Sequence, residues 1–185
     1  MSYFTLSMLL AGVINLIFGI IVFKRNRRRL PNRIFPLFSF FLACWCWVVA
    51  GIMLASDLSV AGILVRAAFG VGAFLPSHFY LFSLVLTMRE NQLSRASRIK
   101  AAGVYLFCAL LAASCFHPAF VEKIYFQPLA PLPGPEVIYN RGLFIVYVGS
   151  VTGLMAYSLF LLLFRLRQLS GVRRQEAQYV FFGVL

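Results

Sequence analysis

The sequence is dominated by apolar blocks that are each about as long as a lipid bilayer is thick. The first block covers residues 3–23 without one charged side chain. At ~1.5 Å per residue, a helix of that length crosses the roughly 30 Å hydrocarbon core of a membrane. Basic residues follow this block and none precede it, an order that favours a retained membrane span over a cleaved signal peptide.

Further blocks of the same kind follow along the chain, at residues 34–55, 60–88, 101–116, 143–164 and 179–185. The chain is 62% hydrophobic and 12% charged, against roughly 45 to 50% and about 25% in soluble globular domains. The blocks are apolar on all faces, as expected of helices surrounded by lipid. The last block is long enough for only about 10 Å of helix. We therefore predict an all-α, polytopic transmembrane helix bundle that forms one domain over residues 1–185, with five complete spans and the start of a sixth.

The charged residues lie almost entirely between the apolar blocks, and basic residues outnumber acidic ones by 17 to 5. The densest basic stretch follows the first block and consists of Lys24, Arg25, Arg27, Arg28, Arg29 and Arg33. Because short basic loops stay in the cytoplasm, this stretch predicts an N-terminus outside. The loops at 89–100 and 165–174, the latter including Arg173 and Arg174, are also basic and agree with this orientation. We expect the basic loops to contact anionic lipid headgroups rather than nucleic acid.

Residues 117–141 form the one long loop predicted on the outer side. This loop holds five of the eight prolines. Prolines at 131, 133 and 135 favour extended, polyproline-like backbone over helix. The aromatic and aliphatic residues of the loop make it too apolar for a free linker, so we expect it to lie over the mouth of the bundle as a lid.

The sequence contains no recognisable catalytic constellation. Gly-rich phosphate loops, paired intramembrane carboxylates, nucleophile elbows and metal-binding histidine pairs are all missing from it. The four cysteines lack the spacing of a zinc site and are interpreted as small packing residues. We therefore predict no catalytic residue, no cofactor and no metal site in this chain.

Three residues of the block at 60–88 are candidates for sensing a ligand or signal. Arg66 is a formal charge inside a span, which indicates either a ligand-gating cavity or an anchor whose side chain reaches the headgroups. Pro76 is predicted to kink its helix. His78 is predicted either to hydrogen-bond a carbonyl that the proline frees or to sense pH or a ligand.

Trp45 and Trp47 are two further candidates. They lie in the middle of the block at 34–55 rather than in an interfacial belt. Their position indicates packing between helices, with contact to a small apolar ligand as the second interpretation.

Two series of residues along the chain carry a family resemblance. The first consists of Asn32-Arg33, Trp45, Trp47, Arg66 and Phe74-Leu75-Pro76. The second consists of Gly142-Leu143-Phe144, Arg165-Leu166-Arg167, Arg173-Arg174-Gln175, Tyr179 and Gly183. In this order they resemble the N-terminal seven-transmembrane (7TM) region of bacterial membrane histidine kinases. The resemblance runs the length of the chain and stops inside the sixth helix.

The resemblance implies a multi-pass input module in the bacterial cytoplasmic membrane that works as a homodimer. In the family such a module precedes cytoplasmic kinase domains or, in some members, a diguanylate cyclase, and neither is present in this sequence. We therefore expect a non-catalytic sensory input module of a two-component system that responds to an apolar or membrane-associated cue. The residues alone leave two alternatives open: a small facilitator or permease-like protein, and a membrane scaffold subunit.

Overall fold

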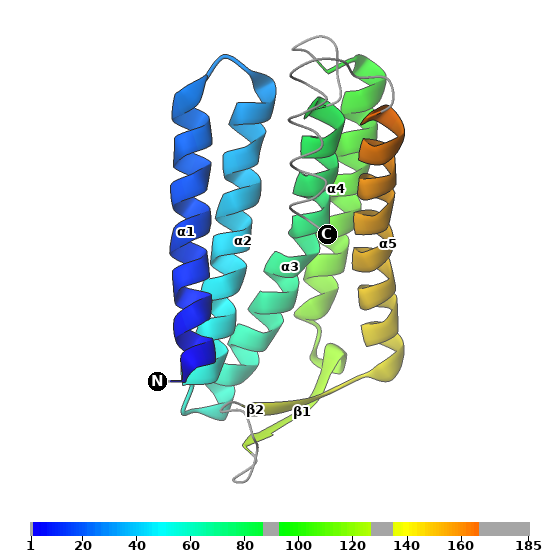
Figure 1. Cartoon of the computed structure of the whole chain (residues 1–185). Helices are drawn as coiled ribbons and strands as arrows, with labels where there is room; N and C mark the ends of the chain where they lie inside the picture. Colours follow the sequence, from blue (N-terminus) through cyan, green and yellow to red (C-terminus); the bar gives the residue numbers. More distant parts are fainter. Residues whose placement is uncertain (1, 87–92, 127–134, 167–185) are drawn as a thin grey trace.

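The computed structural model describes residues 2–86, 93–126 and 135–166, which form long helices and one small antiparallel sheet (Figure 1). The helices are α1 (Tyr3–Arg25), α2 (Leu30–Leu54), α3 (Leu58–Leu86), α4 (Arg95–Cys115) and α5 (Arg141–Leu166). Between α4 and α5 lie a short 3-10 helix η1 (Pro118–Phe120) and strands β1 (Val121–Phe126) and β2 (Pro135–Tyr139).

In the described part of the chain, five helices are long and apolar enough to cross a membrane. The prediction of an all-α bundle of membrane spans is therefore confirmed, and the chain is a multi-pass membrane protein. The predicted start of a sixth span at 179–185, with Arg173 and Arg174 before it, lies outside the described residues.

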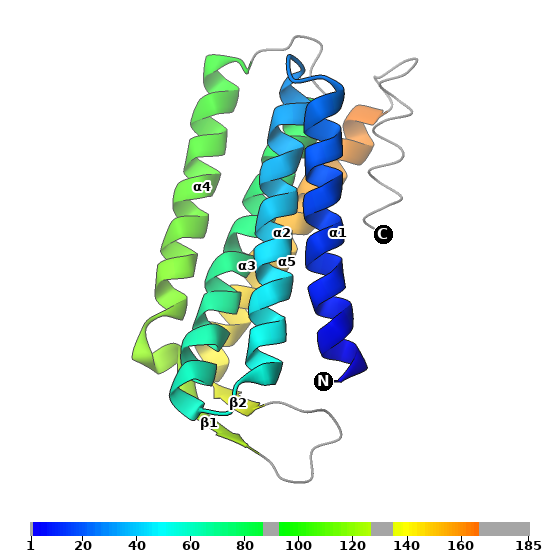
Figure 2. The same cartoon turned by 90° about the vertical axis from the view of Figure 1, so that its left-hand side faces the viewer.

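Helix α3 is the centre of the bundle. It packs against α2, α4, α5 and β1, whereas α1 packs on α2. Figure 2 shows α1 and α4 at opposite edges, with α2 and α3 between them. In its most apolar stretch α3 has 39% of its residues buried, against 11% in α1. The apolar faces that the outer helices leave open suit contact with lipid.

Small residues let α1 approach α2 closely. Gly12 leaves room for the indole of Trp47, whose Nε1 donates a hydrogen bond to the Leu9 carbonyl at 3.3 Å. About two helical turns further along α1, Gly19 faces Ser39 of α2 in the same way. Glycine at such a crossing brings two backbones together, as is common between membrane helices.

Helices α2 and α4 begin four or more residues earlier than hydropathy predicts, and α3 and α5 begin two residues earlier. Helix α4 begins at Arg95 rather than at residue 101, because the Ser94 side chain accepts a hydrogen bond from the Ser97 backbone N–H at 3.2 Å and caps the helix. Its first turns are basic and exposed, so an apolar window does not include them. Helix α2 begins at Leu30, which places Pro36 inside the helix instead of in its first turn.

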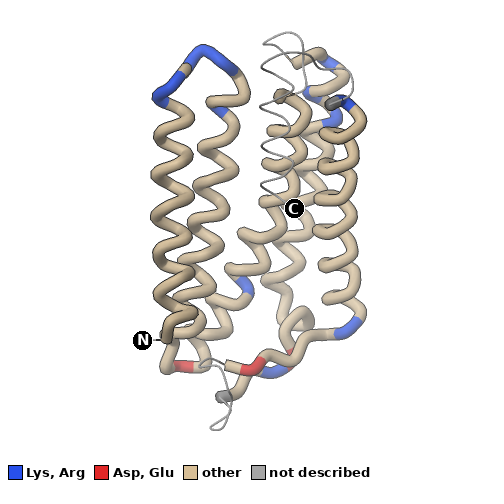
Figure 3. The backbone as a smooth tube through the Cα atoms, viewed as in Figure 1, with Lys and Arg blue, Asp and Glu red and all other residues tan. Residues whose placement is uncertain are grey.

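The two ends of the bundle differ in charge (Figure 3). Lysines and arginines gather at the end that holds the α1–α2 turn, the start of α4 and the end of α5. The acidic residues among those described, Asp57, Glu122 and Glu136, lie at the opposite end with the sheet. Asp57 caps α3 by accepting hydrogen bonds from the Val60 and Ser59 backbone N–H groups, which hold the pKa of its carboxyl below the usual value.

The loop between α4 and α5 contains a β-hairpin that the sequence pattern did not predict. Strands β1 and β2 pair antiparallel, with Tyr125 opposite Glu136 and a bulge near the start of β1. The prolines of the loop predict polyproline-like backbone. In the structure Pro135 is instead the first residue of β2, a position where a strand tolerates proline. Phe120 and Val121 are buried against α3, so the hairpin is fixed to the end of the bundle opposite the α1–α2 turn.

Candidate ligand-binding site

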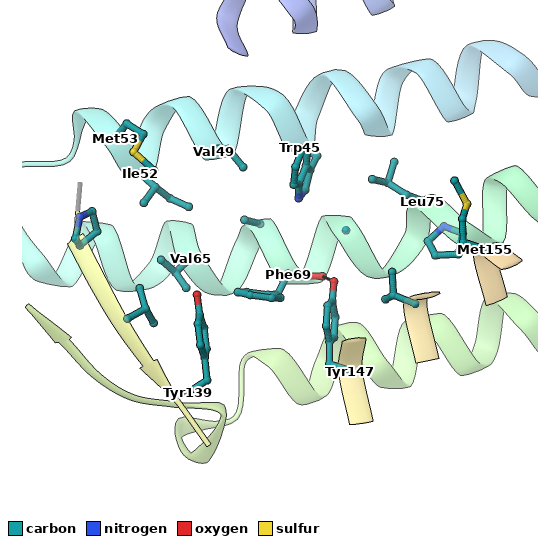
Figure 4. Close-up of a pocket in the computed structure, with 16 residues that line it drawn as sticks. Trp45, Val49, Ile52, Met53, Val65, Phe69, Leu75, Tyr139, Tyr147 and Met155 are labelled. Atoms are coloured by element: carbon teal, nitrogen blue, oxygen red, sulfur yellow. Dashed lines mark hydrogen bonds between the residues drawn. The ribbon is translucent and has the colours of Figure 1, made fainter. Parts of the chain in front are cut away.

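A cavity of about 470 Å³ lies among α2, α3, α5 and β2, at the hairpin end of the bundle (Figure 4). Its volume is typical of sites that hold a small molecule. Helix α3 supplies Val65, Ala68, Phe69, Gly72, Leu75 and Pro76. The other elements supply Trp45, Val49, Ile52, Met53, Pro135, Val137, Tyr139, Tyr147, Val151 and Met155.

Gly72 allows two aromatic side chains to reach the backbone of α3. A Cβ at this position would lie 2.9 Å from the Tyr147 hydroxyl oxygen and 3.4 Å from Trp45 Nε1. The Tyr147 hydroxyl donates a hydrogen bond to the Phe69 carbonyl at 2.8 Å and so joins α5 to α3. The glycine thus sets the spacing of the three helices around the cavity.

Phe69 connects the wall of the cavity to the hairpin. Its ring makes edge-to-face contacts with Phe120, Tyr139 and Tyr147, at centroid distances of 5.2, 5.2 and 5.0 Å. Such contacts are favourable between aromatic rings. Movement of β2 relative to α5 would therefore have to disturb Phe69, which lines the cavity.

Three polar side-chain groups of the lining can take part in hydrogen bonds: the hydroxyls of Tyr139 and Tyr147 and the indole N–H of Trp45. The Tyr147 proton is used by the Phe69 carbonyl. Trp45 Nε1 and the Tyr139 hydroxyl have no hydrogen-bond partner within the described residues. Burial raises the pKa of Tyr139, which keeps its hydroxyl protonated at neutral pH. The cavity therefore offers two donors, and Figure 4 shows both turned into it.

Arg66 neighbours the lining residue Val65 but lies outside the cavity. Its guanidinium lies beside Gly62, near Ile124 of β1, where a Cβ on Gly62 would be 3.6 Å from Arg66 Nη1. Its Nε is buried and has no hydrogen-bond partner in the described part of the chain. The side chain thus extends toward the hairpin end of α3, the direction expected of an anchor, and its role in sensing stays a prediction.

His78 lies between helices, farther along α3 from the hairpin than the cavity is. Its Nδ1 is 2.8 Å from the Phe74 carbonyl oxygen, and its ring contacts Phe41 and Tyr105 at centroid distances of 4.3 and 5.1 Å. The predicted partner was a carbonyl freed by Pro76, which would be that of Gly72, four residues earlier. That prediction was wrong, because the imidazole reaches back one turn along its own helix and meets Phe74 instead.

The five predicted sensing residues therefore separate. Trp45 and Pro76 line the cavity, whereas Arg66, His78 and Trp47 lie elsewhere. The residues that the sequence reasoning missed include Phe69, Tyr139 and Tyr147. A tyrosine inside an apolar span was the one available signal, and it marked Tyr147 alone of these three.

Comparison with known proteins supplies the family. The sequence model of the family described as the N-terminal 7TM region of histidine kinase matches residues 7–185. Comparisons with curated proteins and with solved structures gave no match. In this family the region is a sensory module without a catalytic domain. The chain belongs to the N-terminal 7TM region family of histidine kinases and is a non-catalytic, membrane-embedded sensory input module.

Proposed function

We propose that this module detects a small apolar molecule in the cavity among α2, α3, α5 and β2, and that it controls the kinase domain of a two-component system. The cavity carries this proposal, because it combines the volume of a ligand site with two unused hydrogen-bond donors. Membership of the chain in a sensory family favours signal detection over transport. A diguanylate cyclase in place of the kinase would be served by the same input.

The module is proposed to lie in the bacterial cytoplasmic membrane with its N-terminus and hairpin outside. Support comes from the basic residues at one end of the bundle, because short basic loops remain in the cytoplasm. Lys24, Arg25 and the basic residues that follow them between α1 and α2 are proposed to contact anionic headgroups. The family also favours a homodimer.

The signal is proposed to travel through the angle between α3 and α5. Pro76 borders the cavity and leaves the Gly72 carbonyl without its usual helical donor, so α3 bends most easily beside the ligand. Helix α5 runs from the cavity to the basic end of the bundle, where Arg165 lies in its last turn. A ligand that prefers one α3–α5 arrangement shifts the population toward it and changes the output.

A substitution that fills the cavity tests this proposal. In the full-length kinase, Val151→Phe places a ring in the cavity and is expected to change autophosphorylation by at least ~5-fold, the lower end of typical coupling between sites. Val146→Phe is the matched control, since Val146 lies on the same helix and is 60% exposed. It should leave autophosphorylation unchanged. Wild-type output from Val151→Phe, with normal membrane insertion, would reject the cavity as the sensing site.

A further inference from the structure

We infer that the cavity selects an uncharged, elongated molecule that carries hydrogen-bond acceptor oxygens, such as a long-chain ester or ketone. This inference rests on the proposed function and names the ligand class for the same site. It follows from three features of the cavity: the position of the nearest charges, the nature of the two unused donors, and the shape of the lining.

Among the described residues, none that lines the cavity carries a formal charge. The two charged neighbours of lining residues both face away from the cavity. Arg66 lies beside Gly62 and Ile124, and the Glu136 carboxylate accepts a hydrogen bond from Tyr125 on the other strand. Residues 127–134, between the strands, include no ionisable side chain. An ion in the cavity would therefore be removed from water without a counter-charge, which is strongly unfavourable.

The unused polar groups select for acceptors on the ligand. An indole N–H can only donate, so Trp45 requires an acceptor atom on the molecule beside it. The Tyr139 hydroxyl can donate as well. Trp45 lies against Gly72, whereas Figure 4 shows Tyr139 beside Val65, about 10 Å away along the axis of α3. A carbonyl or ester oxygen satisfies either donor without adding a charge.

The lining extends along the axis of α3. On α3 it runs from Val65 to Pro76, about 16 Å at the rise of a helix. Met53 and Met155 lie toward its two ends in Figure 4. Methionine side chains adapt to flexible apolar groups, so the two ends suit the ends of a chain better than a rigid ring system.

The two tryptophans of the chain provide the test. In the full chain purified in detergent, Trp47→Phe leaves Trp45 as a reporter inside the cavity. Trp45→Phe leaves Trp47, which contacts Gly12 on α1, as the matched control. Bromine quenches indole fluorescence at short range. The probes are methyl dibromostearate and the sulfonate and trimethylammonium compounds that carry the same dibrominated chain.

The ester is expected to quench Trp45 saturably, with half-saturation at a concentration at least about tenfold lower than for either charged probe. All three probes should quench Trp47 weakly and alike. Tyr139→Phe should weaken binding of the ester while leaving the emission spectrum of the free protein unchanged, which reports that the fold is intact.

The other outcomes separate the two proposals. Equal affinity for the sulfonate and the ester would overturn the ligand class and leave the cavity as a binding site; loss of sulfonate binding in Arg66→Met would then make Arg66 its counter-ion. No saturable quenching of Trp45 by any probe would overturn the cavity as a binding site, and the proposed function with it.

Discussion

At the scale of single residues, Tyr147 and Gly72 decide how α5 meets α3. Tyr147 is 6% exposed, and its hydroxyl donates a hydrogen bond to the Phe69 carbonyl of the central helix α3. That approach is open because Gly72 has no side chain, since a Cβ there would come within 2.9 Å of the hydroxyl oxygen. The pair therefore acts as one contact, and substitutions at the two positions should not be additive.

A double-mutant cycle measures this contact. Tyr147→Phe removes one buried hydrogen bond and should lower the free energy of unfolding by about 1 kcal/mol. Gly72→Ala should cost about the same in the wild-type background, because the new methyl group displaces the hydroxyl. In the Tyr147→Phe background it should be neutral or stabilising, since alanine favours helix more than glycine does.

Thermal unfolding in detergent, followed by circular dichroism, gives these free energies. Gly149→Ala is the control, because within the described residues no atom apart from the neighbouring backbone of its own helix lies within 4 Å of a Cβ at Gly149. Strict additivity of Gly72→Ala and Tyr147→Phe would show that the two side chains do not share a contact.

The residues that could be predicted from the sequence are those that contrast with their surroundings. Trp45 and Pro76 stand out in apolar spans and do line the cavity. Arg66 and His78 stand out equally, but their orientation depends on which face of α3 meets the hairpin and α4. Phe69 is one of 20 phenylalanines, so its central position follows from tertiary contacts that no local pattern contains.

At the scale of elements, the helices were predictable and the hairpin was not. Long uncharged blocks leave helix as the one local structure that satisfies its own backbone in lipid. The strands of the hairpin are short, and the loop prolines masked their alternation. Since β2 provides Pro135, Val137 and Tyr139 to the cavity, the missed element is also why the site could not be assembled from the sequence.

The hairpin contains one cross-strand pair that can be titrated. The Tyr125 hydroxyl donates a hydrogen bond to the Glu136 carboxylate, and this bond raises the pKa of Tyr125. A tyrosine whose pKa is raised in the folded state favours that state below its unfolded pKa of about 10, and the contribution is lost as the pH rises through the folded pKa. The hairpin should therefore lose this support in alkaline solution.

Glu136→Gln tests the pair without disturbing the strands. It is expected to lower the pKa of Tyr125 toward the ordinary tyrosine value, because the carboxylate that favoured the protonated phenol is gone. Carbon-13 NMR of labelled tyrosine rings gives the titration. Tyr139 is the internal control, since burial raises its pKa and should continue to do so. An unchanged Tyr125 titration would contradict the pair.

At the scale of the whole molecule, the main group of basic residues and the cavity lie at opposite ends. The basic residues collect where α5 ends, and the cavity lies beside the hairpin at the other end. In the proposed function, the ligand binds near one surface of the membrane, and the change passes through α3 and α5 toward the other. The direction of that transfer depends on which end faces the cytoplasm.

Orientation is tested with single cysteines and a maleimide that does not cross membranes. Two exposed residues mark the two ends of the bundle. Asn26 lies in the basic turn between α1 and α2, and Ser59 lies at the start of α3, at the hairpin end. Because the positive-inside rule places the basic turn in the cytoplasm, Ser59→Cys should react in intact cells and Asn26→Cys after permeabilisation alone. The native cysteines all lie within membrane helices, three of them buried, so they add little background. The reverse pattern of labelling would place the hairpin and the cavity on the cytoplasmic side, where a ligand would have to arrive from inside the cell.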